Sequence, residues 1–282
     1  MNPHSDTLTT ADGRTALRME RRLAHPPRKV WSAITDPAQI GQWFPSDVSV
    51  ELEPGGAMTF TMPGVTGLPM TGRVTDVDEP RLFAFTWGED HLSWEITPDG
   101  DGSLLTLVHT FGDRFGSASF ASGWHLCITA LSQLLDGEPT AVDPDTGELH
   151  EAYLDQFDLG RGTVEQTADG PRIRFERQLV RPAAAVWAAL TSGDEPVPGE
   201  EAPHGFTAEK VPAGPVLEVR APTLLAYRWH PEGTVRWELG AGTGHGARLV
   251  LTQTGPHAFD ADTALAAWHA RIDHLAARLL EA

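Results

Sequence analysis

The clearest candidate for a chemically active side chain in this sequence is His109. It follows Leu105 and Leu107 at alternate positions, so in a strand the three side chains share one face, and the two leucines require that face to be buried. Two interpretations stay open. His109 either meets a bound molecule, as a hydrogen-bond partner or a general acid or base, or it is a core histidine held by a neighbouring polar group.

The other histidines offer less chemistry. His125 lies one position off the apolar stripe of a helix expected over residues 120–135, which favours packing at the helix flank. His269 and Asp273 are four residues apart, beside His274, but a metal site needs a third ligand and the sequence does not indicate one. We therefore expect no metal.

Other reactive groups and cofactor motifs are missing from the sequence. The single Cys127 excludes an intrachain disulfide and a cysteine-rich zinc site. There is no glycine-rich nucleotide loop, no serine-centred elbow and no cysteine–histidine nucleophile pair. The sequence thus predicts no cofactor and assigns no catalytic residue.

A sheet and a long helix must position these side chains. Residues 15–25 alternate in polarity and predict a strand, two short helices are expected up to Trp43, and the long helix spans residues 120–135. Its apolar stripe is needed to cover one face of an antiparallel sheet, and a space left between them would accept a small apolar ligand. The remaining strands are expected at residues 47–52, 57–62, 71–78, 81–88, 91–97 and 103–111.

The sequence contains this pattern twice. Residues 18–35 are echoed by residues 174–191 with nine identical positions. Gln253 takes the position of His109, and Trp43 has no counterpart. The repeat predicts a tandem duplication, with a first domain and connecting helical segment over residues 1–160 and a shortened second domain over residues 165–282. Eight of the nine tryptophans form pairs in matching order, namely Trp31 with Trp187, Trp87 with Trp229, Trp94 with Trp237 and Trp124 with Trp268.

Charge and composition narrow the partners. The chain has 21 Lys and Arg against 39 Asp and Glu, a formal net charge of −18 that would repel phosphate backbones and anionic lipids. We therefore expect no nucleic-acid partner and no membrane partner. No apolar stretch approaches the ~18 to 20 residues of a membrane span, and the N-terminal residues lack the order of a secretory signal, so we expect a soluble, cytoplasmic protein.

Several motifs follow one another along the first half, namely Pro27-Arg-Lys-Val-Trp31, Trp43-Phe44, Glu53-Pro-Gly-Gly56, Gly72-Arg-Val-Thr-Asp-Val-Asp-Glu-Pro80, Leu105-Thr-Leu-Val-His109 and Gly123-Trp124. On these motifs the first half resembles the SRPBCC (START-like) superfamily, in the branch named after the activator of heat-shock protein 90 ATPase homologues. The resemblance implies an α+β class with two helix-grip domains, each a curved antiparallel sheet wrapped around a long C-terminal helix, and the sheet of the family has seven strands. The second half lacks a Trp43-Phe44 equivalent and is one strand short, which predicts a smaller or closed cavity.

The leading hypothesis is a bacterial protein whose first domain binds a small hydrophobic ligand without chemistry of its own. We expect that domain alone to enclose a cavity of ~300 Å³ or more, with His109 as its principal polar group. The aromatic side chains either stack on such a ligand or fill the core. The resemblance also permits a cyclase or hydratase type of enzyme acting on a polyketide-like or aromatic molecule, or a co-chaperone-like protein-interaction module. The expected ligand contacts are Trp43, Phe44, Phe60, Phe85, Trp87, Trp94, Leu107, His109 and Trp124.

Overall fold

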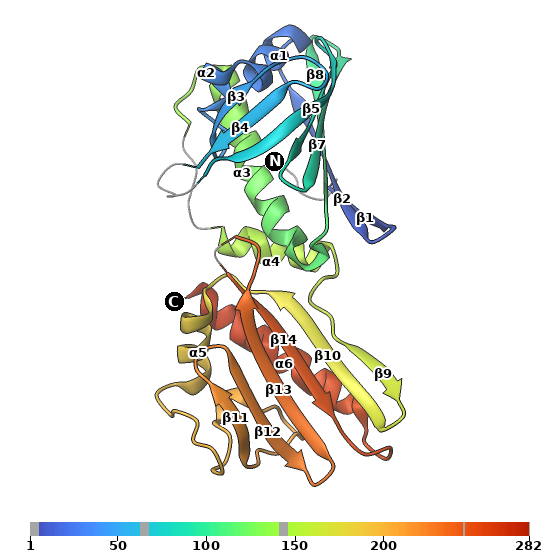
Figure 1. The fold of residues 1–282 in the computed structure, drawn as a ribbon, viewed down its shortest axis with the longest axis vertical. Coiled ribbons are helices and arrows are strands. Elements are labelled where there is room, and N and C mark those ends of the chain that lie inside the picture. Colours follow the sequence, from blue (N-terminus) through green and yellow to red (C-terminus); the bar gives the residue numbers. More distant parts are fainter. Residues whose placement is uncertain (1–5, 63–67, 141–145, 245, 282) are drawn as a thin grey trace. The chain divides into compact units, whose positions relative to one another are not determined.

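The computed structural model describes residues 6–62, 68–140, 146–244 and 246–281, and it divides into two compact units (Figure 1). Unit 1 is Met1–Asp145 and unit 2 is Thr146–Ala282. This division precedes the boundary at residues 160–170 that the repeat suggests. Helix α4 (Gly147–Gln156) falls in unit 2, where its Glu151 carboxylate accepts hydrogen bonds from Arg177 at 2.6 and 2.7 Å.

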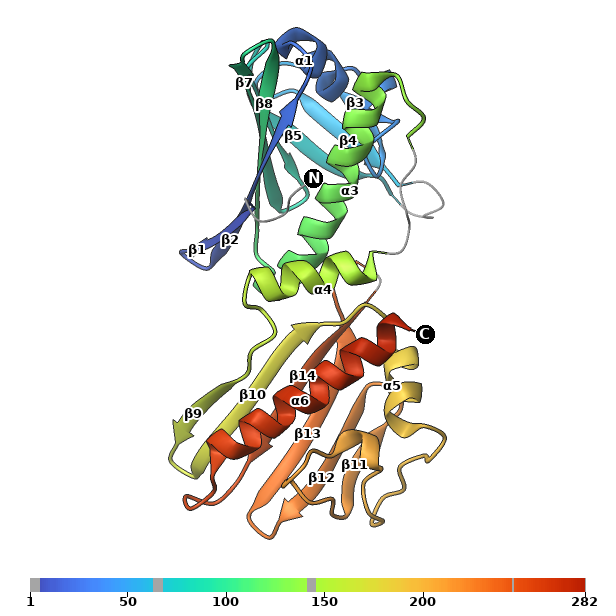
Figure 2. The same cartoon turned by 180° about the vertical axis from the view of Figure 1, so that it is seen from behind.

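Unit 1 is a β-sheet with helices on one of its faces (Figures 1 and 2). Its antiparallel strand order is β1-β2-β8-β7-β6-β5-β4-β3. The elements are β1 (Thr7–Ala11), β2 (Arg14–Leu23), α1 (Pro27–Thr35), α2 (Pro37–Ile40), β3 (Asp47–Val50), β4 (Ala57–Thr61), β5 (Met70–Asp78), β6 (Leu82–Trp87), β7 (Asp90–Asp99), β8 (Gly102–Phe111), η2 (Arg114–Gly116) and α3 (Ser117–Asp136).

The two faces of this sheet follow the period-two pattern of the sequence. Alternate residues Leu17, Met19 and Leu23 of β2 are buried, and β8 buries Leu105, Leu107 and His109 on the same side. Helix α3 lies across that face and ends at Gly137, whose φ of 74° is the left-handed conformation that glycine adopts at a helix end. The expected register of β8 is therefore confirmed.

Strand β1 was not expected from the sequence, which predicted seven strands where the described part of unit 1 has eight. Asp12 and Gly13 both have positive φ, 51° and 73°, and form the two-residue turn that joins β1 to β2. Unit 2 repeats the segment, since residues 10–13 and residues 167–170 both read Thr-Ala-Asp-Gly. The turn of the β9–β10 hairpin is built on this second copy, so the duplication begins earlier than the first matched residues indicated.

Unit 2 repeats the same element order with fewer strands. Its strand order is β11-β12-β13-β14-β10-β9, and its long helix α6 lies on one face of the sheet (Figure 2). The α+β class with two antiparallel sheets, each with a C-terminal helix, is confirmed. After α4 the elements are β9 (Thr163–Thr167), β10 (Gly170–Gln178), α5 (Ala183–Thr191), η3 (His204–Phe206), β11 (Val216–Arg220), β12 (Leu224–His230), β13 (Gly233–Ala241), β14 (Ala247–Thr254) and α6 (Ala261–Leu280).

In place of a β3–β4 hairpin, unit 2 has the segment of residues 192–215, which contains η3. The second sheet is thus two strands shorter than the first among the described residues, where the sequence predicted one. Phe206 of this segment packs its ring on Trp237 at 5.6 Å, as Trp43 of unit 1 packs on Trp94 at 5.6 Å. The sequence predicted no replacement for Trp43-Phe44. Phe206 nevertheless supplies one ring, from η3 and not from the turn after a second short helix.

A buried arginine occupies the same place in both units. Arg21 of β2 is 6% exposed and donates two hydrogen bonds to Asp6, at 2.5 and 2.7 Å. Its counterpart Arg177 of β10 is 2% exposed and pairs with Glu151. In each unit the carboxylate comes from the segment that precedes the sheet. That segment therefore pairs the buried guanidinium, which would otherwise have no counter-charge.

Candidate functional site

Aromatic side chains gather between α3 and the sheet of unit 1. Phe44, in the turn after α2, lies at their centre, with its ring centroid 5.4 Å from that of Trp87, 5.7 Å from Trp124 and 6.1 Å from Phe60. Trp94 meets Trp124 at 5.6 Å. We call this group the aromatic cluster, and it consists of Trp43, Phe44, Phe60, Phe85, Trp87, Trp94 and Trp124.

The two residues that start the cluster are held differently. The indole N–H of Trp43 donates to the carbonyl oxygen of Ala33 in α1 at 2.9 Å, so its position is fixed by a hydrogen bond as well as by packing. Helix α2, which precedes it, begins where the Asp36 carboxylate accepts from the backbone N–H of Ala38. Phe44 has no polar group and is held by ring contacts alone.

The cavity beside the cluster is almost completely filled. Its volume is about 10 Å³, which is the space of about one water molecule. This cavity is far smaller than the expected ~300 Å³, because aromatic and aliphatic side chains occupy the space between helix and sheet. Those lining it are Ile34, Ile40, Trp43, Phe44, Val48, Met58, Phe60, Phe83, Phe85 and Trp94.

Of the nine expected contacts, five line this cavity: Trp43, Phe44, Phe60, Phe85 and Trp94. Trp87 and Trp124 join through their ring contacts with Phe44, while Leu107 is fully buried opposite Trp94 in the sheet. The expected contacts do not include five further lining residues, although their places in the apolar periodicity of α1, α2 and the strands indicate them: Ile34, Ile40, Val48, Met58 and Phe83.

His109 is fully buried and both of its ring nitrogens are bonded. Trp124 donates its indole N–H to Nδ1 at 3.0 Å, and Nε2 lies 3.2 Å from a carboxylate oxygen of Asp90. Because an indole N–H can only donate, Nδ1 is the accepting nitrogen and Nε2 carries the proton. These two bonds agree with the second interpretation, a core histidine held by neighbouring polar groups, and His109 does not line the small cavity.

Trp87, by contrast, has an unpaired polar atom. Its side chain is partly buried, its Nε1 atom is fully buried, and this N–H has no hydrogen-bond partner among the described residues. The ring faces Phe44, Phe60 and Trp124. Met70 lies against Gly88, the residue that follows Trp87, and is 45% exposed.

This arrangement lies within the segment that a family model recognises. Residues 24–136 match the model of the Activator of Hsp90 ATPase homolog 1-like proteins. Unit 1 belongs to that family. The match contains α1 through α3, and hence the whole aromatic cluster, His109 and Asp90. No curated protein sequence matches the chain.

Solved structures similar to this chain each correspond to about half of it. A conserved protein of unknown function, EF2215 from Enterococcus faecalis, is 22% identical, with 55% of this chain and 91% of that chain covered and a TM-score of 0.48. CalU16 from Micromonospora echinospora is 20% identical, with coverages of 54% and 94% and a TM-score of 0.43. NE0264 from Nitrosomonas europaea is 23% identical, with coverages of 45% and 97% and a TM-score of 0.41.

Unit 2 preserves one polar feature of the Activator of Hsp90 ATPase homolog 1-like unit and loses another. Trp268 of α6 donates to Gln253 Oε1 at 2.6 Å, which repeats the bond from Trp124 to His109. Gly233 stands at the position of Asp90, because Val235 pairs with Gln253 as Leu92 pairs with His109. No carboxylate is therefore present there, and the Gln253 amide nitrogen is buried without a partner among the described residues.

The counterpart of Trp87 is fully bonded. Trp229 donates its indole N–H to the carbonyl oxygen of Thr254 at 2.7 Å. A Cβ at Gly233 would lie 2.5 Å from that indole nitrogen and 2.9 Å from the Thr254 oxygen, so only glycine permits this bond. In the family unit, Asp90 occupies the place of Gly233, and Trp87 is left without an equivalent acceptor.

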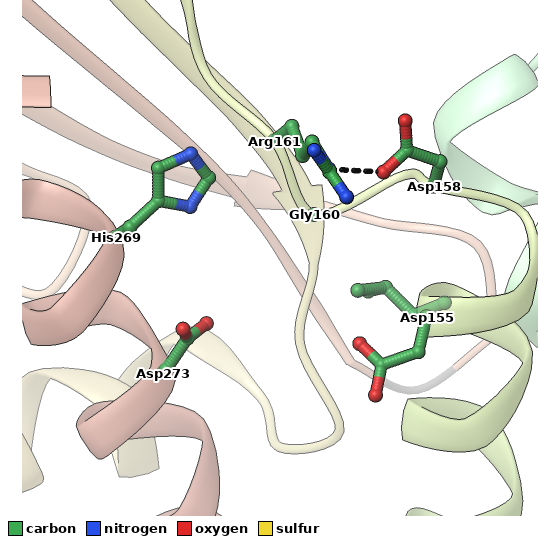
Figure 3. A pocket seen from close by; sticks show the side chains of 7 residues that line it. Asp155, Asp158, Gly160, Arg161, His269 and Asp273 are labelled. Carbon is green, nitrogen blue, oxygen red and sulfur yellow. Dashed lines mark ion pairs between the residues drawn. The ribbon is translucent and has the colours of Figure 1, made fainter. Parts of the chain in front are cut away.

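Pockets larger than the small cavity of unit 1 lie on unit 2, and they are open to solvent. They have volumes of about 480, 390 and 360 Å³. In the first, His269 and Asp273 project from α6 and face Asp155 of α4 across the space, while Arg161 pairs with Asp158 (Figure 3).

The polar character of that pocket is acidic. Burial lowers the pKa of His269, the nearby Asp273 opposes the shift, and the imidazole is therefore neutral at pH 7. Three carboxylates then face one guanidinium. No set of three or more His, Cys, Asp or Glu side chains is arranged to hold a metal ion in the part of the chain that the structure describes.

Two further observations limit the chemistry of the chain. Burial raises the pKa of the Cys127 thiol on α3 to about 12, so this thiol stays protonated near neutral pH and is a poor nucleophile. No helix within the described residues combines the length and the apolar character that crossing a membrane requires.

Proposed function

We propose that unit 1 binds a small, largely apolar ligand that carries an oxygen acceptor, and that it does so within the aromatic cluster without catalysing a reaction. The observation that carries this proposal is the unpaired indole N–H of Trp87, whose buried nitrogen has no acceptor among the described residues. Leaving such a donor unpaired costs about 1 to 3 kcal/mol. A ligand oxygen placed against Nε1 would recover that free energy.

The surroundings of Trp87 fit an aromatic ligand. Its ring borders Phe44, Phe60 and Trp124, and aromatic rings attract a further ring in edge or offset contact, by about 0.5 to 1.5 kcal/mol each. The partly exposed Met70 beside Gly88 offers a polarisable apolar surface at the outer end. Together these groups favour a flat molecule with one polar end.

Binding requires a side chain to move, because the present cavity of about 10 Å³ holds no ligand. Phe44 is the candidate. It is central to the cluster, follows a helix of only four residues and makes no hydrogen bond through its side chain, whereas Trp43 is anchored to Ala33. A ligand would replace the Phe44 ring contacts with its own, and the free energy of moving Phe44 would reduce the observed affinity.

The alternatives receive less support. A cyclase or hydratase needs a general acid or base near the ligand, and both nitrogens of His109 are already bonded, to Trp124 and Asp90. A co-chaperone-like interaction stays a prediction from the resemblance alone.

The proposal is tested with two probes that differ in one acceptor, 2-acetylnaphthalene and 2-ethylnaphthalene, titrated into the full chain by calorimetry. The wild-type protein should bind the ketone about tenfold more tightly than the hydrocarbon, since only the ketone accepts a hydrogen bond from Trp87. Trp87→Phe should bind both probes equally. That variant should also be close to wild-type in stability, because it removes a donor that has no partner.

Trp31→Phe is the matched control, since it alters another core tryptophan of unit 1, whose ring meets Phe83. It should retain the preference for the ketone. Absence of saturable binding by the wild-type protein, or a Trp87→Phe variant that still prefers the ketone tenfold, would contradict the proposal.

A further inference from the structure

The second pocket of unit 2, with a volume of about 390 Å³, combines aromatic walls with a free cation. It is formed by the end of β12, the segment before α6 and Lys210, and its volume falls in the range of small-molecule sites. Trp229 and Phe259 form one wall, with ring centroids 4.8 Å apart, and Pro256 extends the apolar surface.

Lys210 supplies the charge. It is exposed, it lines the pocket, and it makes no hydrogen bond or ion pair with the described residues. The chain has only two lysines, and the other, Lys29, donates to the Leu135 carbonyl oxygen at 2.5 Å. Lys210 also adopts a φ of 65°, a left-handed conformation that is uncommon outside glycine, asparagine and aspartate.

His230 adds a hydrogen-bond donor, because one of its ring nitrogens is already an acceptor. The backbone N–H of Glu232 donates to its Nδ1 at 3.2 Å, so the neutral ring carries its proton on Nε2. The imidazole lies 5.5 Å from the Trp229 ring, on the same wall of the pocket. An ammonium and an imidazole N–H thus border one aromatic surface.

The carboxylate of the pocket is already engaged. Asp260 caps α6 by accepting from the backbone N–H of Thr263 at 3.1 Å and from its hydroxyl at 2.7 Å, and these bonds lower the pKa of Asp260. Its oxygens are therefore committed to the helix end. Lys210 is close enough to Asp260 to act on it electrostatically, yet it keeps its hydrogen-bonding capacity free.

From these contacts we infer that unit 2 binds a planar aromatic carboxylate in this pocket. The aromatic part stacks on Trp229 and Phe259, and the carboxylate accepts from the Lys210 ammonium and from His230 Nε2. The site is separate from the aromatic cluster of unit 1 and does not depend on the function proposed for it. A neutral or cationic analogue loses the two charge-assisted bonds, so the pocket discriminates by charge.

The test titrates the full chain with 2-naphthoate, with 2-(aminomethyl)naphthalene as the probe of opposite charge. We expect saturable binding of the carboxylate and at least tenfold weaker binding of the amine. Lys210→Asn should raise the dissociation constant for 2-naphthoate about tenfold, and asparagine tolerates the left-handed backbone at that position. Lys29→Gln, which removes the other lysine, should leave the constant unchanged.

Three results would overturn the inference: no saturable binding of 2-naphthoate at millimolar concentration, equal affinity for the two probes, or an unchanged dissociation constant in Lys210→Asn. Trp87→Phe separates the two sites. If that variant, rather than Lys210→Asn, weakens 2-naphthoate, the carboxylate binds in unit 1 and the site in unit 2 is refuted.

Discussion

The two units place four tryptophans at matching positions, but they satisfy the indole N–H groups differently. In unit 2 all four donate, Trp187 to Glu195, Trp229 to Thr254, Trp237 to Phe206 and Trp268 to Gln253. In unit 1 Trp124 donates to His109, whereas Trp87 has no acceptor among the described residues. The four tryptophan positions are therefore shared by both copies, and the acceptors of their indole N–H groups distinguish the copies.

One exchange accounts for much of this difference. Gly233 lets the Trp229 indole approach the Thr254 carbonyl, while Asp90 at the same position instead orients His109. Unit 1 thus gains a bonded histidine and leaves Trp87 unpaired. Unit 2 pairs Trp229 and leaves the Gln253 amide nitrogen unpaired. The exchange thus leaves a different buried N–H without a partner in each copy, that of Trp87 in unit 1 and that of Gln253 in unit 2.

The largest difference between the units should come from the buried arginines. Arg21→Met leaves Asp6, which is completely buried, without its cation, and should destabilise unit 1 by about 3 to 5 kcal/mol. Arg177→Met should cost unit 2 less, about 2 kcal/mol, because Glu151 is 20% exposed and can be hydrated. Native-state hydrogen exchange read by mass spectrometry reports each unit separately.

The double variant Asp6→Asn with Arg21→Met is the control, and it should recover more than half of the stability lost by unit 1. Equal losses in the two single variants would show that burial of the carboxylate does not set the cost.

Removing the hydrogen bond from Trp124 of α3 to His109 of β8 should have an intermediate effect on the free energy of unfolding. His109→Leu leaves the Trp124 N–H buried and unpaired and should destabilise unit 1 by about 2 kcal/mol. His109→Gln should cost less than about 1 kcal/mol, because Gln253 shows that a glutamine at this position accepts the same bond. Unfolding in urea measures both, and Gln253→Leu should reproduce the larger loss in unit 2. Equal costs for leucine and glutamine at position 109 would mean that shape, and not the hydrogen bond, matters there.

The smallest effect concerns pH. Burial is the largest cause that lowers the pKa of both His125 and His269 from the ordinary 6.5. The second largest cause differs: Arg21 lowers the pKa of His125 further, whereas Asp273 raises that of His269. Since the unfolded chain then binds protons more readily, stability present above pH 6.5 should be lost as the pH falls below that value. The loss should be under about 1 kcal/mol per unit, because both rings are partly solvated, and larger in unit 1.

Thermal unfolding at pH 7.5 and 5.5 checks this dependence. His125→Gln and His269→Gln should each flatten the response of their own unit, and the exposed His257→Gln should not. A steeper loss in unit 2 than in unit 1 would contradict the assigned roles of Arg21 and Asp273.

Much of the fold could be predicted from local patterns. The alternation in residues 15–25, the register that buries Leu105, Leu107 and His109, and the stripe of α3 each reflect a single element meeting the core. The hairpin signal Asp12-Gly13 was available in the sequence and predicts β1. Its repetition at residues 169–170 predicts the β9–β10 hairpin in the same way.

The candidate site could be predicted only in part, because its properties depend on distances between elements. Sequence spacing indicated that His109 shares a face with the aromatic rings, but not that Trp124 and Asp90 bond both of its nitrogens. It did not indicate that Phe44 fills the space that a ligand would need. Side-chain rotamers decide such questions, and periodicity does not encode them.

In both sheets the first long strand pairs with the last one. Strand β2 is completed only by β8, and β10 only by β14, so neither sheet closes until nearly all of its unit exists. During synthesis the chain emerges from its N-terminus, and β8 is available to β2 before β10 has been made. Refolding from denaturant removes that order, and β2 and β10, which share the pattern Arg-x-Glu-Arg-x-Leu at residues 18–23 and 174–179, can then each meet β8 or β14. We therefore expect strands to be exchanged between the two units more often during refolding from denaturant than during synthesis.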